Sequence, residues 1–152
     1  MQILNRDELL KLENQFCFAV YACAREITKL YRPHLDELGI TYTQYVALLA
    51  LWERDDITVK ELGARLYLDS GTLTPLLKKL EALKLLTRIR DPQDERNVRI
   101  RLTPQGAALK EKAYDLPEKL FCVTGMTEDE TTALRLRLTS LLEQVHLKTT
   151  EE

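Results

Sequence analysis

Three cysteines, Cys17, Cys23 and Cys122, are the side chains of this sequence that could carry out covalent chemistry. Their spacing contains neither a Cys-x-x-Cys pair nor a zinc-binding pattern, so it predicts no metal site, and nothing in the chain points to a cofactor. The chemistry that remains open to them is oxidation of a thiol. In a reducing cytosol, an oxidisable thiol is more often a sensor than a structural disulfide.

Cys17 has the most suggestive surroundings, because it lies between Phe16 and Phe18 in the run NQFCFAV. A peroxide is attacked by a thiolate, and an ordinary thiol, with a pKa of about 8.5, is mostly protonated at neutral pH. Apolar neighbours suit an organic hydroperoxide better than hydrogen peroxide. A free cysteine is nevertheless most often a small core residue, and the residues around Cys17 favour that role when taken alone. Packing is also the simplest role for Cys23 and Cys122.

The second distinctive region is basic. Residues 60–101 contain ten Lys or Arg and six Asp or Glu, a net charge of +4, whereas the rest of the chain has a net charge of −6. The whole protein, at −2, is not a uniformly basic nucleic-acid binder. An acidic body with one basic segment is typical of a protein that touches DNA at one place.

The basic segment has the pattern of a DNA-docking element. Residues 58–86 predict two short helices joined by a tight turn, and the segment 87–106 predicts a small β-hairpin with arginines on its outer face. The second helix of such an arrangement can enter the major groove while the hairpin reaches the flanking backbone or minor groove. The alternative is a small α+β domain whose arginines are merely solvated. The order helix, turn, helix, hairpin favours DNA binding.

The elements that position these residues follow from periodicity, caps and turns. The expected helices are Asp7 to Tyr31, a short one from Pro33 to near Gly39, one from Thr43 to about Arg54, one capped by Thr58 with Glu61 and ending near Leu66, one ending near Lys84, one opened by Thr103 and Pro104, and one from Thr127 with Glu130 to about His146. The start of the helix ending near Lys84 is open between a cap at Asp69 or Ser70 and a start at Thr74. The hairpin loop is expected from Asp91 to Asn97.

The sequence predicts a single domain over residues 1–152, mainly α with a small β-hairpin (α+β). In this interpretation residues 43–103 form a winged helix-turn-helix, and the long helical segments 1–40 and 104–152 pair between chains as dimerisation helices. A two-fold dimer presents two recognition helices to successive major grooves, about 34 Å apart, and therefore fits a pseudo-palindromic operator.

The string DERNVRIRLT, from Asp94 to Thr103, matches the wing pattern Asp-x-Arg-(five residues)-Leu-Thr of MarR-type winged-helix repressors. Gly106 and the segment LDSGTLTPLLKKLE fit the same family. The resemblance implies that Arg96 enters the minor groove and that Asp94 holds the wing. It also implies base-edge or phosphate contacts from Ser70, Thr72 and Thr74 and phosphate contacts from Lys79 and Arg88.

The segment LENQFCFAVYACAREITKLYRP, with ITYTQY after it, resembles the start of one MarR subfamily, the organic hydroperoxide resistance repressors, and the resemblance spans essentially the whole chain. It implies that Cys17 is the peroxide-reactive thiol and that Tyr31 and Tyr42 donate hydrogen bonds to its sulfur. Cys122 falls where the two-cysteine branch of that subfamily has its resolving cysteine. The resemblance pairs Cys17 with Cys122 of the other subunit.

Helix geometry restricts how Tyr31 could act. It follows Cys17 by fourteen residues, which returns it to nearly the same helix face but about 21 Å further along the axis. A tyrosine side chain cannot span that distance. If Tyr31 contacts Cys17, we expect the contact to come from the partner chain, so that the pocket exists only in the dimer.

Together these features predict a cytoplasmic, homodimeric repressor that releases double-stranded operator DNA when an organic hydroperoxide oxidises Cys17. The alternative is a MarR-type repressor released by a small phenolic ligand, with the cysteines as bystanders. A thiol peroxidase would need a site for its reductant and usually a βαβ scaffold, so we expect no enzyme. The longest uncharged run, Leu38 to Trp52, is too short to span a membrane.

Overall fold

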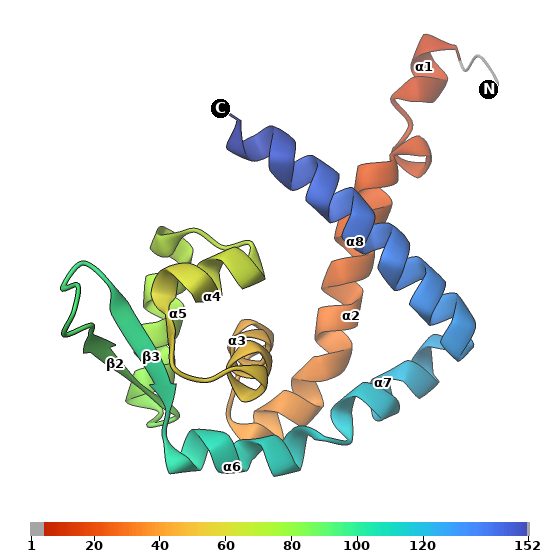
Figure 1. Ribbon diagram of the computed structural model, residues 1–152. Coiled ribbons are helices and arrows are strands. Elements are labelled where there is room, and N and C mark those ends of the chain that lie inside the picture. Colours follow the sequence, from red (N-terminus) through yellow and green to blue (C-terminus); the bar gives the residue numbers. More distant parts are fainter. Residues whose placement is uncertain (1–4, 152) are drawn as a thin grey trace. The chain divides into compact units, whose positions relative to one another are not determined.

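The computed structural model describes residues 5–151 (Figure 1). These residues are mainly helical with a small antiparallel sheet, as the sequence predicts. Backbone contacts divide the chain into two compact units, one up to Tyr42 and one from Thr43 onward. The helices are α1 (Arg6–Leu9), the short 3-10 helix η1 (Leu12–Asn14), α2 (Phe16–Leu38), α3 (Tyr42–Glu53), α4 (Val59–Leu66), α5 (Ser70–Ala82), α6 (Pro104–Ala113), α7 (Leu116–Thr124) and α8 (Glu128–Thr150), and the strands are β1 (Ile57–Thr58), β2 (Leu86–Arg90) and β3 (Val98–Leu102).

The first unit is broken ahead of Cys17, so the prediction of one helix over residues 7–31 is wrong. The side-chain amide of Gln15 donates to the carbonyl oxygens of Leu9, at 2.7 Å, and Lys11, at 3.0 Å. Such side-chain bonds to the backbone compete with the helical ladder, and apolar periodicity does not reveal them. As a result Cys17 is the second residue of a new helix, α2.

Helix α2 runs through Pro33, so the interruption expected there is also wrong. A proline inside a helix removes one backbone hydrogen bond, and here the helix continues on both sides of it. Gly39 ends α2 in the left-handed region at φ +72°, where glycine has no Cβ penalty. Cys17 and Tyr31 therefore lie on one continuous helix.

The core of the second unit is built mainly from leucines. Helix α3 spans Tyr42–Glu53, so Thr43, which was expected to cap it, lies inside the helix, and the helix ends one residue before the predicted end. Its Trp52 indole Nε1 donates to the Gly106 carbonyl oxygen at 2.9 Å and so joins α3 to the start of α6. The largest fully buried side chains of this unit are Leu48, Leu51, Ile57, Leu62, Leu73, Leu77, Leu80, Leu86 and Ile100.

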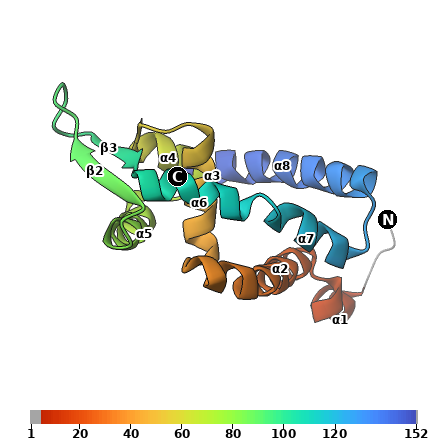
Figure 2. The same cartoon turned by 90° about the horizontal axis from the view of Figure 1, so that it is seen from below.

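The sheet has three antiparallel strands in the order β1-β3-β2, one strand more than the predicted hairpin. Strand β1 is too short to give an alternating pattern, and its Ile57 pairs with Ile100 of β3. On the other side of β3, Arg88 of β2 also lies opposite Ile100. The hairpin of residues 86–102, hereafter the wing, extends beyond α4 and α5 in both views (Figures 1 and 2).

A close backbone approach fixes the start of α6 behind the wing. Thr103 caps this helix, with its Oγ1 accepting from the Gly106 N–H at 3.0 Å, and its own N–H donates to the Leu85 carbonyl oxygen at 3.1 Å. A Cβ at Gly106 would lie 1.9 Å from the same oxygen, so only glycine fits there. The last helix, α8, extends beyond the predicted end near His146, to Thr150.

Candidate nucleic-acid interface and thiol site

Helices α4 and α5 form the predicted helix-turn-helix. A capping box starts α4, in which Thr58 Oγ1 accepts from the Glu61 N–H at 3.1 Å and the Glu61 carboxylate accepts from the Thr58 N–H at 2.8 Å. Asp69 caps α5, accepting from the Thr72 N–H at 2.7 Å, so the helix starts at Ser70. The ambiguity in the sequence is resolved in favour of the earlier start, and Thr74 lies inside the helix.

A groove of about 490 Å³ separates α4 and α5 from the wing. Four of the predicted DNA-binding residues line it: Ser70, Thr74, Arg88 and Arg96. The other two on α5, Thr72 and Lys79, are exposed but do not line the groove. The opposite face of α5 is in the core, with Leu73, Leu76, Leu77 and Leu80 buried. The groove thus combines hydroxyl groups at a helix start with two arginines.

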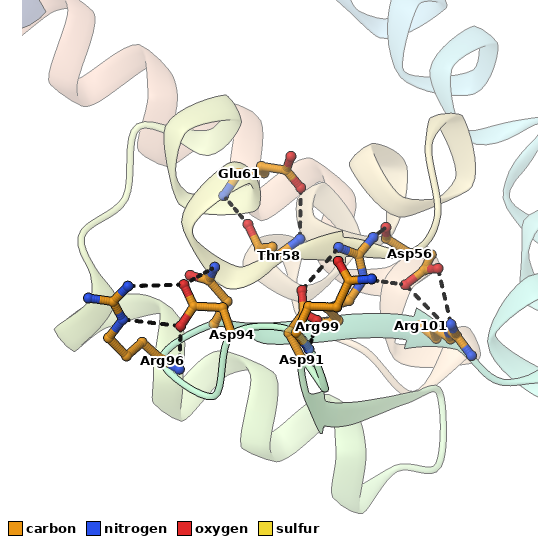
Figure 3. Close-up of polar contacts among 10 residues, drawn as sticks. Asp56, Thr58, Glu61, Asp91, Asp94, Arg96, Arg99 and Arg101 are labelled. Atoms are coloured by element: carbon orange, nitrogen blue, oxygen red, sulfur yellow. Dashed lines mark hydrogen bonds and ion pairs between the residues drawn. The ribbon is translucent and has the colours of Figure 1, made fainter.

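The tip of the wing is organised by Asp94. Its carboxylate accepts from the Arg96 backbone N–H at 3.2 Å and from Arg96 Nε and Nη2 at 3.1 and 3.3 Å, as Figure 3 shows. These bonds to Arg96 lower the pKa of Asp94. The Arg96 side chain is still 90% exposed, so its guanidinium projects into solvent at the wing tip.

Strand β2 is fastened to α5 by Arg88. Its guanidinium donates to the Glu81 carboxylate at 3.1 Å through Nη2, and its backbone N–H donates to the same carboxylate at 3.1 Å. The hydrogen bond from Arg88 lowers the pKa of Glu81. The sequence predicts Arg88 on the outer face of the hairpin, whereas in the structure its side chain is only 25% exposed and pairs with Glu81. One ion pair holds its charge at the edge of the groove.

Strand β3 is fastened by a residue that the sequence analysis missed. Arg99 Nε donates to Asp56 Oδ1 at 2.9 Å, and Arg101 Nη2 donates to Asp56 Oδ2 at 3.2 Å. Arg101 is exposed, as its predicted place on the outer face requires, and Arg99 is half-buried, but the shared partner Asp56 was not predicted. The partner lies more than forty positions earlier in the chain, so no local pattern reveals the contact.

The thiol site is only partly assembled within one chain. Cys17 is exposed near the start of α2, where Phe16 and Phe18 are exposed as well. The rings of Tyr31 and Tyr42 contact each other edge to face, with centroids 5.0 Å apart. Because α2 is continuous, Tyr31 lies about 21 Å along the helix from Cys17 and cannot reach it within the same chain.

Tyr31 is half-buried beside Tyr42. Partial burial and the neighbouring Tyr42 raise the pKa of its phenol above the ordinary value. The hydroxyl therefore keeps its proton at neutral pH. Cys122, the predicted resolving cysteine, is exposed on α7 in the second unit.

Helix α8 has apolar side chains that the chain itself does not cover. Among its residues, all of which the structure describes, none is buried. A stable helix normally buries its apolar side chains against a partner surface. The exposed apolar side chains of α8 are Leu134, Leu136, Leu138, Leu142, Val145 and Leu147.

Residues 5–151 contain no group of three or more His, Cys, Asp or Glu side chains placed to hold a metal ion. Within the same range, no helix is long and apolar enough to cross a membrane.

The sequence is similar to those of known regulators. A family model described as transcriptional regulator SarA/Rot matches residues 29–113. The organic hydroperoxide resistance transcriptional regulator of Bacillus subtilis (strain 168) is 51% identical over 144 residues, which covers 95% of this chain and 98% of that protein.

The fold is similar to that of a DNA-bound regulator. The structure of reduced AbfR bound to DNA superposes with a TM-score of 0.75 and 34% identity, covering 91% of this chain and 96% of that one. A structure of disulfide-formed AbfR has a TM-score of 0.62 and 34% identity, covering 90% of this chain and 96% of that one. AbfR is a protein of Staphylococcus epidermidis.

Proposed function

The chain belongs to the MarR family of winged-helix transcriptional regulators, in the branch of the organic hydroperoxide resistance regulators. We propose that it is a dimeric repressor that leaves its operator when an organic hydroperoxide oxidises Cys17. Its relatives are transcriptional regulators and not enzymes. The observation that carries the DNA-binding part is the groove between α5 and the wing, with the exposed Arg96 at its end.

In the proposed complex, α5 enters the major groove and the wing lies along the flanking minor groove. Hydroxyl groups in the first turns of α5 reach base edges or phosphates, because a helix N-terminus also attracts phosphate oxygens. Arg96 occupies the narrow minor groove, where the negative potential is enhanced. The α5 hydroxyls are those of Ser70, Thr72 and Thr74, the phosphate contacts are Lys79 and Arg88, and Asp94 sets the wing tip.

The Arg96→Ala variant should bind the operator more weakly by about 1–3 kcal/mol, or about 5- to 150-fold in Kd. The lost contact is a charged donor in the minor groove. Stability should not change, because Arg96 is 90% exposed. The matched control is Arg90→Ala, which removes the same charge from an exposed position of β2 and should cost much less. Equal Kd values for wild type and Arg96→Ala at fixed salt would remove the wing tip from the interface.

The proposed dimer uses the apolar surfaces that one chain leaves uncovered. These are the side chains on α8 and the aromatic residues at the start of α2. Residues 1–40 and 104–152 supply the interface, and residues 43–103 bind DNA. Two-fold symmetry then requires half-sites about 34 Å apart in a pseudo-palindromic operator.

The redox step begins with attack of the Cys17 thiolate on the hydroperoxide O–O bond, which gives a sulfenic acid at Cys17 and releases the alcohol. The thiol of Cys122 in the other subunit then condenses with the sulfenic acid, forming a disulfide and releasing water. A disulfide needs Cα atoms roughly 4.4–6.8 Å apart. Closing it would move helices of the dimer framework and change the spacing of the two α5 helices. The disulfide-formed state of the similar AbfR supports such a step.

Tyr31 and Tyr42 are proposed to activate Cys17 from the partner subunit. Replacing either with phenylalanine should slow oxidation by about ten-fold or more, because a hydrogen bond to a charged group contributes about 1.5–3 kcal/mol. Operator affinity should stay the same. The measurement is the rate of sulfenic acid formation after addition of an organic hydroperoxide.

A mixed dimer tests the partner contribution directly. One subunit carries Cys17→Ser and the other Tyr31→Phe, so the remaining Cys17 faces an intact Tyr31 only across the interface. Its oxidation rate should return to the wild-type value. A rate that stays as slow as in the Tyr31→Phe homodimer would contradict activation across the interface.

The decisive experiment is a mobility shift on a DNA fragment from the chain's own promoter, with and without an organic hydroperoxide. We expect a retarded complex that the hydroperoxide dissociates and a thiol reductant restores. Absence of a complex in reducing buffer would contradict the proposed function.

One surface feature favours the second candidate, release by a phenolic ligand. A groove of about 320 Å³ in the second unit is lined by aromatic side chains, including Trp52 and Tyr114, with Lys110 beside them. The Lys110 ammonium group lies 5.8 Å from the Tyr114 ring centroid and could pair with the carboxylate of an aromatic ligand. Release by salicylate of a variant lacking all three cysteines would support this candidate. Release by hydroperoxide that requires Cys17 would support the first.

A further inference from the structure

The base of the wing is held by the turn between α3 and β1. Asp56 accepts from Arg99 and Arg101 through its carboxylate, and its carbonyl oxygen also accepts from Arg99 Nη2 (Figure 3). The preceding Asp55 accepts from the Leu102 backbone N–H at 2.9 Å. Two consecutive aspartates therefore hold one end of β3.

The contacts continue from this turn toward the wing tip. Arg99 Nη1 lies 3.8 Å from Asp91 Oδ2. Asp91 starts the wing loop, and its backbone N–H donates to the Asn97 carbonyl oxygen at 2.8 Å. Asn97 in turn donates its N–H to the carbonyl oxygen of Asp94 at 2.9 Å. An unbroken chain of polar contacts thus links Asp56 to the turn that bears Arg96.

The backbone of Asp56 has the conformation that this double contact needs. Its φ is +55°, in the left-handed region, where aspartate and asparagine are the side chains best tolerated after glycine. The hydrogen bonds from Arg101 and then Arg99 lower the pKa of Asp56, so its carboxylate is charged at neutral pH.

The ion pairs of Asp56 are solvent-exposed, so they contribute little to the stability of the fold. The wing also has a separate attachment through Arg88 and Glu81 on β2. What the Asp56 contacts determine is therefore the direction of the wing rather than its existence.

A small error in that direction matters at the tip. Arg101 and Arg96 are five residues apart, and because β3 begins only at Val98 their separation is at most about 16 Å. A tilt of about 10° at the base therefore moves the tip by up to about 3 Å, which is as long as a hydrogen bond.

We propose that Asp56 is a positioning residue for DNA recognition, which holds Arg99 and Arg101 so that the wing presents Arg96 to the minor groove. This role rests on the proposed function. It requires no contact between Asp56 and DNA.

Asp56→Asn tests the role with little change in shape. Asparagine tolerates the same φ and keeps one acceptor oxygen, but it loses the charge that pairs with two arginines. Operator affinity should fall about 3- to 10-fold, which is less than for loss of Arg96 itself. Simple electrostatics predicts the opposite sign, because removing a negative charge should strengthen binding to DNA.

The matched control is Glu53→Gln. It removes one negative charge and one ion pair, the 2.6 Å contact of Glu53 with Arg65, in the same unit but away from the wing. Its operator affinity should stay equal to that of the wild type or rise slightly. Both variants should keep the wild-type melting temperature within a few degrees.

A double variant separates positioning from a general structural effect. In the Arg96→Ala background, Asp56→Asn should change operator affinity less than about two-fold, because Asp56 acts through the Arg96 side chain, which is absent in that background. Arg101→Lys, which keeps the charge but loses the paired geometry, should repeat the Asp56→Asn loss and provides the test if Asp56→Asn does not fold.

The outcomes distinguish the two proposals. If the wild-type protein binds the operator, two results would overturn the positioning role alone. One is an operator affinity of Asp56→Asn equal to that of Glu53→Gln, and the other is an Asp56→Asn loss that adds in full to the loss from Arg96→Ala. Wild-type protein that binds no operator would overturn the proposed function and the positioning role with it.

Discussion

The Cys17→Ser variant should remain on operator DNA at hydroperoxide concentrations that release the wild-type protein completely. A serine hydroxyl cannot form a sulfenic acid, so the first redox step is lost. DNA affinity without peroxide should match the wild type, because residue 17 lies in the first unit and the residues proposed to bind DNA lie in the second. The measurement is a mobility shift over a hydroperoxide titration. If the hydroperoxide releases Cys17→Ser from DNA at the same concentrations as the wild-type protein, another group senses the peroxide.

The other cysteines provide the controls. Oxidised wild type should run as a covalent dimer on a non-reducing gel and revert with a thiol reductant. Cys122→Ser should lack that band and leave Cys17 open to overoxidation, whereas Cys23→Ser should keep it. A Cys17–Cys23 linkage in peptide mapping, or no covalent dimer at all, would contradict the inter-subunit disulfide but not the DNA-binding assignment.

Operator affinity should fall by roughly 10³- to 10⁵-fold between about 50 and about 200 mM salt if the dimer neutralises about 6–10 phosphates. The physical reason is release of condensed counterions, which depends on the basic segment and not on the net charge of −2. The measurement is the slope of log Kd against log salt concentration.

The Arg96→Ala variant provides a quantitative check on that slope. If Arg96 lies between minor-groove phosphates, its loss should reduce the slope by up to about one, whereas Glu53→Gln should leave it unchanged. A nearly flat salt dependence for the wild type would contradict binding through the basic segment.

Elements with a local chemical signature could be predicted from the sequence. The capping residues Thr58, Thr103 and Thr127 each accept from the N–H three residues further on, as expected. The alternation of β3 places Ile100 inside, as expected. Caps and alternation need only neighbouring residues, so a single sequence contains the necessary information.

Features that depend on competition or distance could not be predicted. The break before α2 depends on side-chain amides that donate hydrogen bonds to backbone carbonyl oxygens. The helix also continues on both sides of Pro33, although proline is a local signal for a helix end. Asp56 was missed because its partners lie on a strand far along the chain. The same long-range pairing fastens Arg99 and Arg101 to Asp56, whereas Arg88 is held by Glu81, seven residues earlier.

Helix geometry also explains why Tyr31 is proposed to act on Cys17 of the partner chain and not on Cys17 of its own chain. Helix rise alone excludes a contact between Cys17 and Tyr31 in one chain, and the continuous α2 strengthens that exclusion. In the proposed dimer, the donors to Cys17 therefore come from the second chain.

Trp52 gives the molecule an optical reporter of its own. It is the single tryptophan in the sequence, so all indole fluorescence comes from one place. Its Nε1 donates to the Gly106 carbonyl oxygen, and its ring lies 6.4 Å from that of Tyr45. Emission therefore reports on the junction of α3 with α6 without any label, and a time-resolved trace after mixing with hydroperoxide would show whether that junction moves and, if so, whether it moves before or after thiol oxidation.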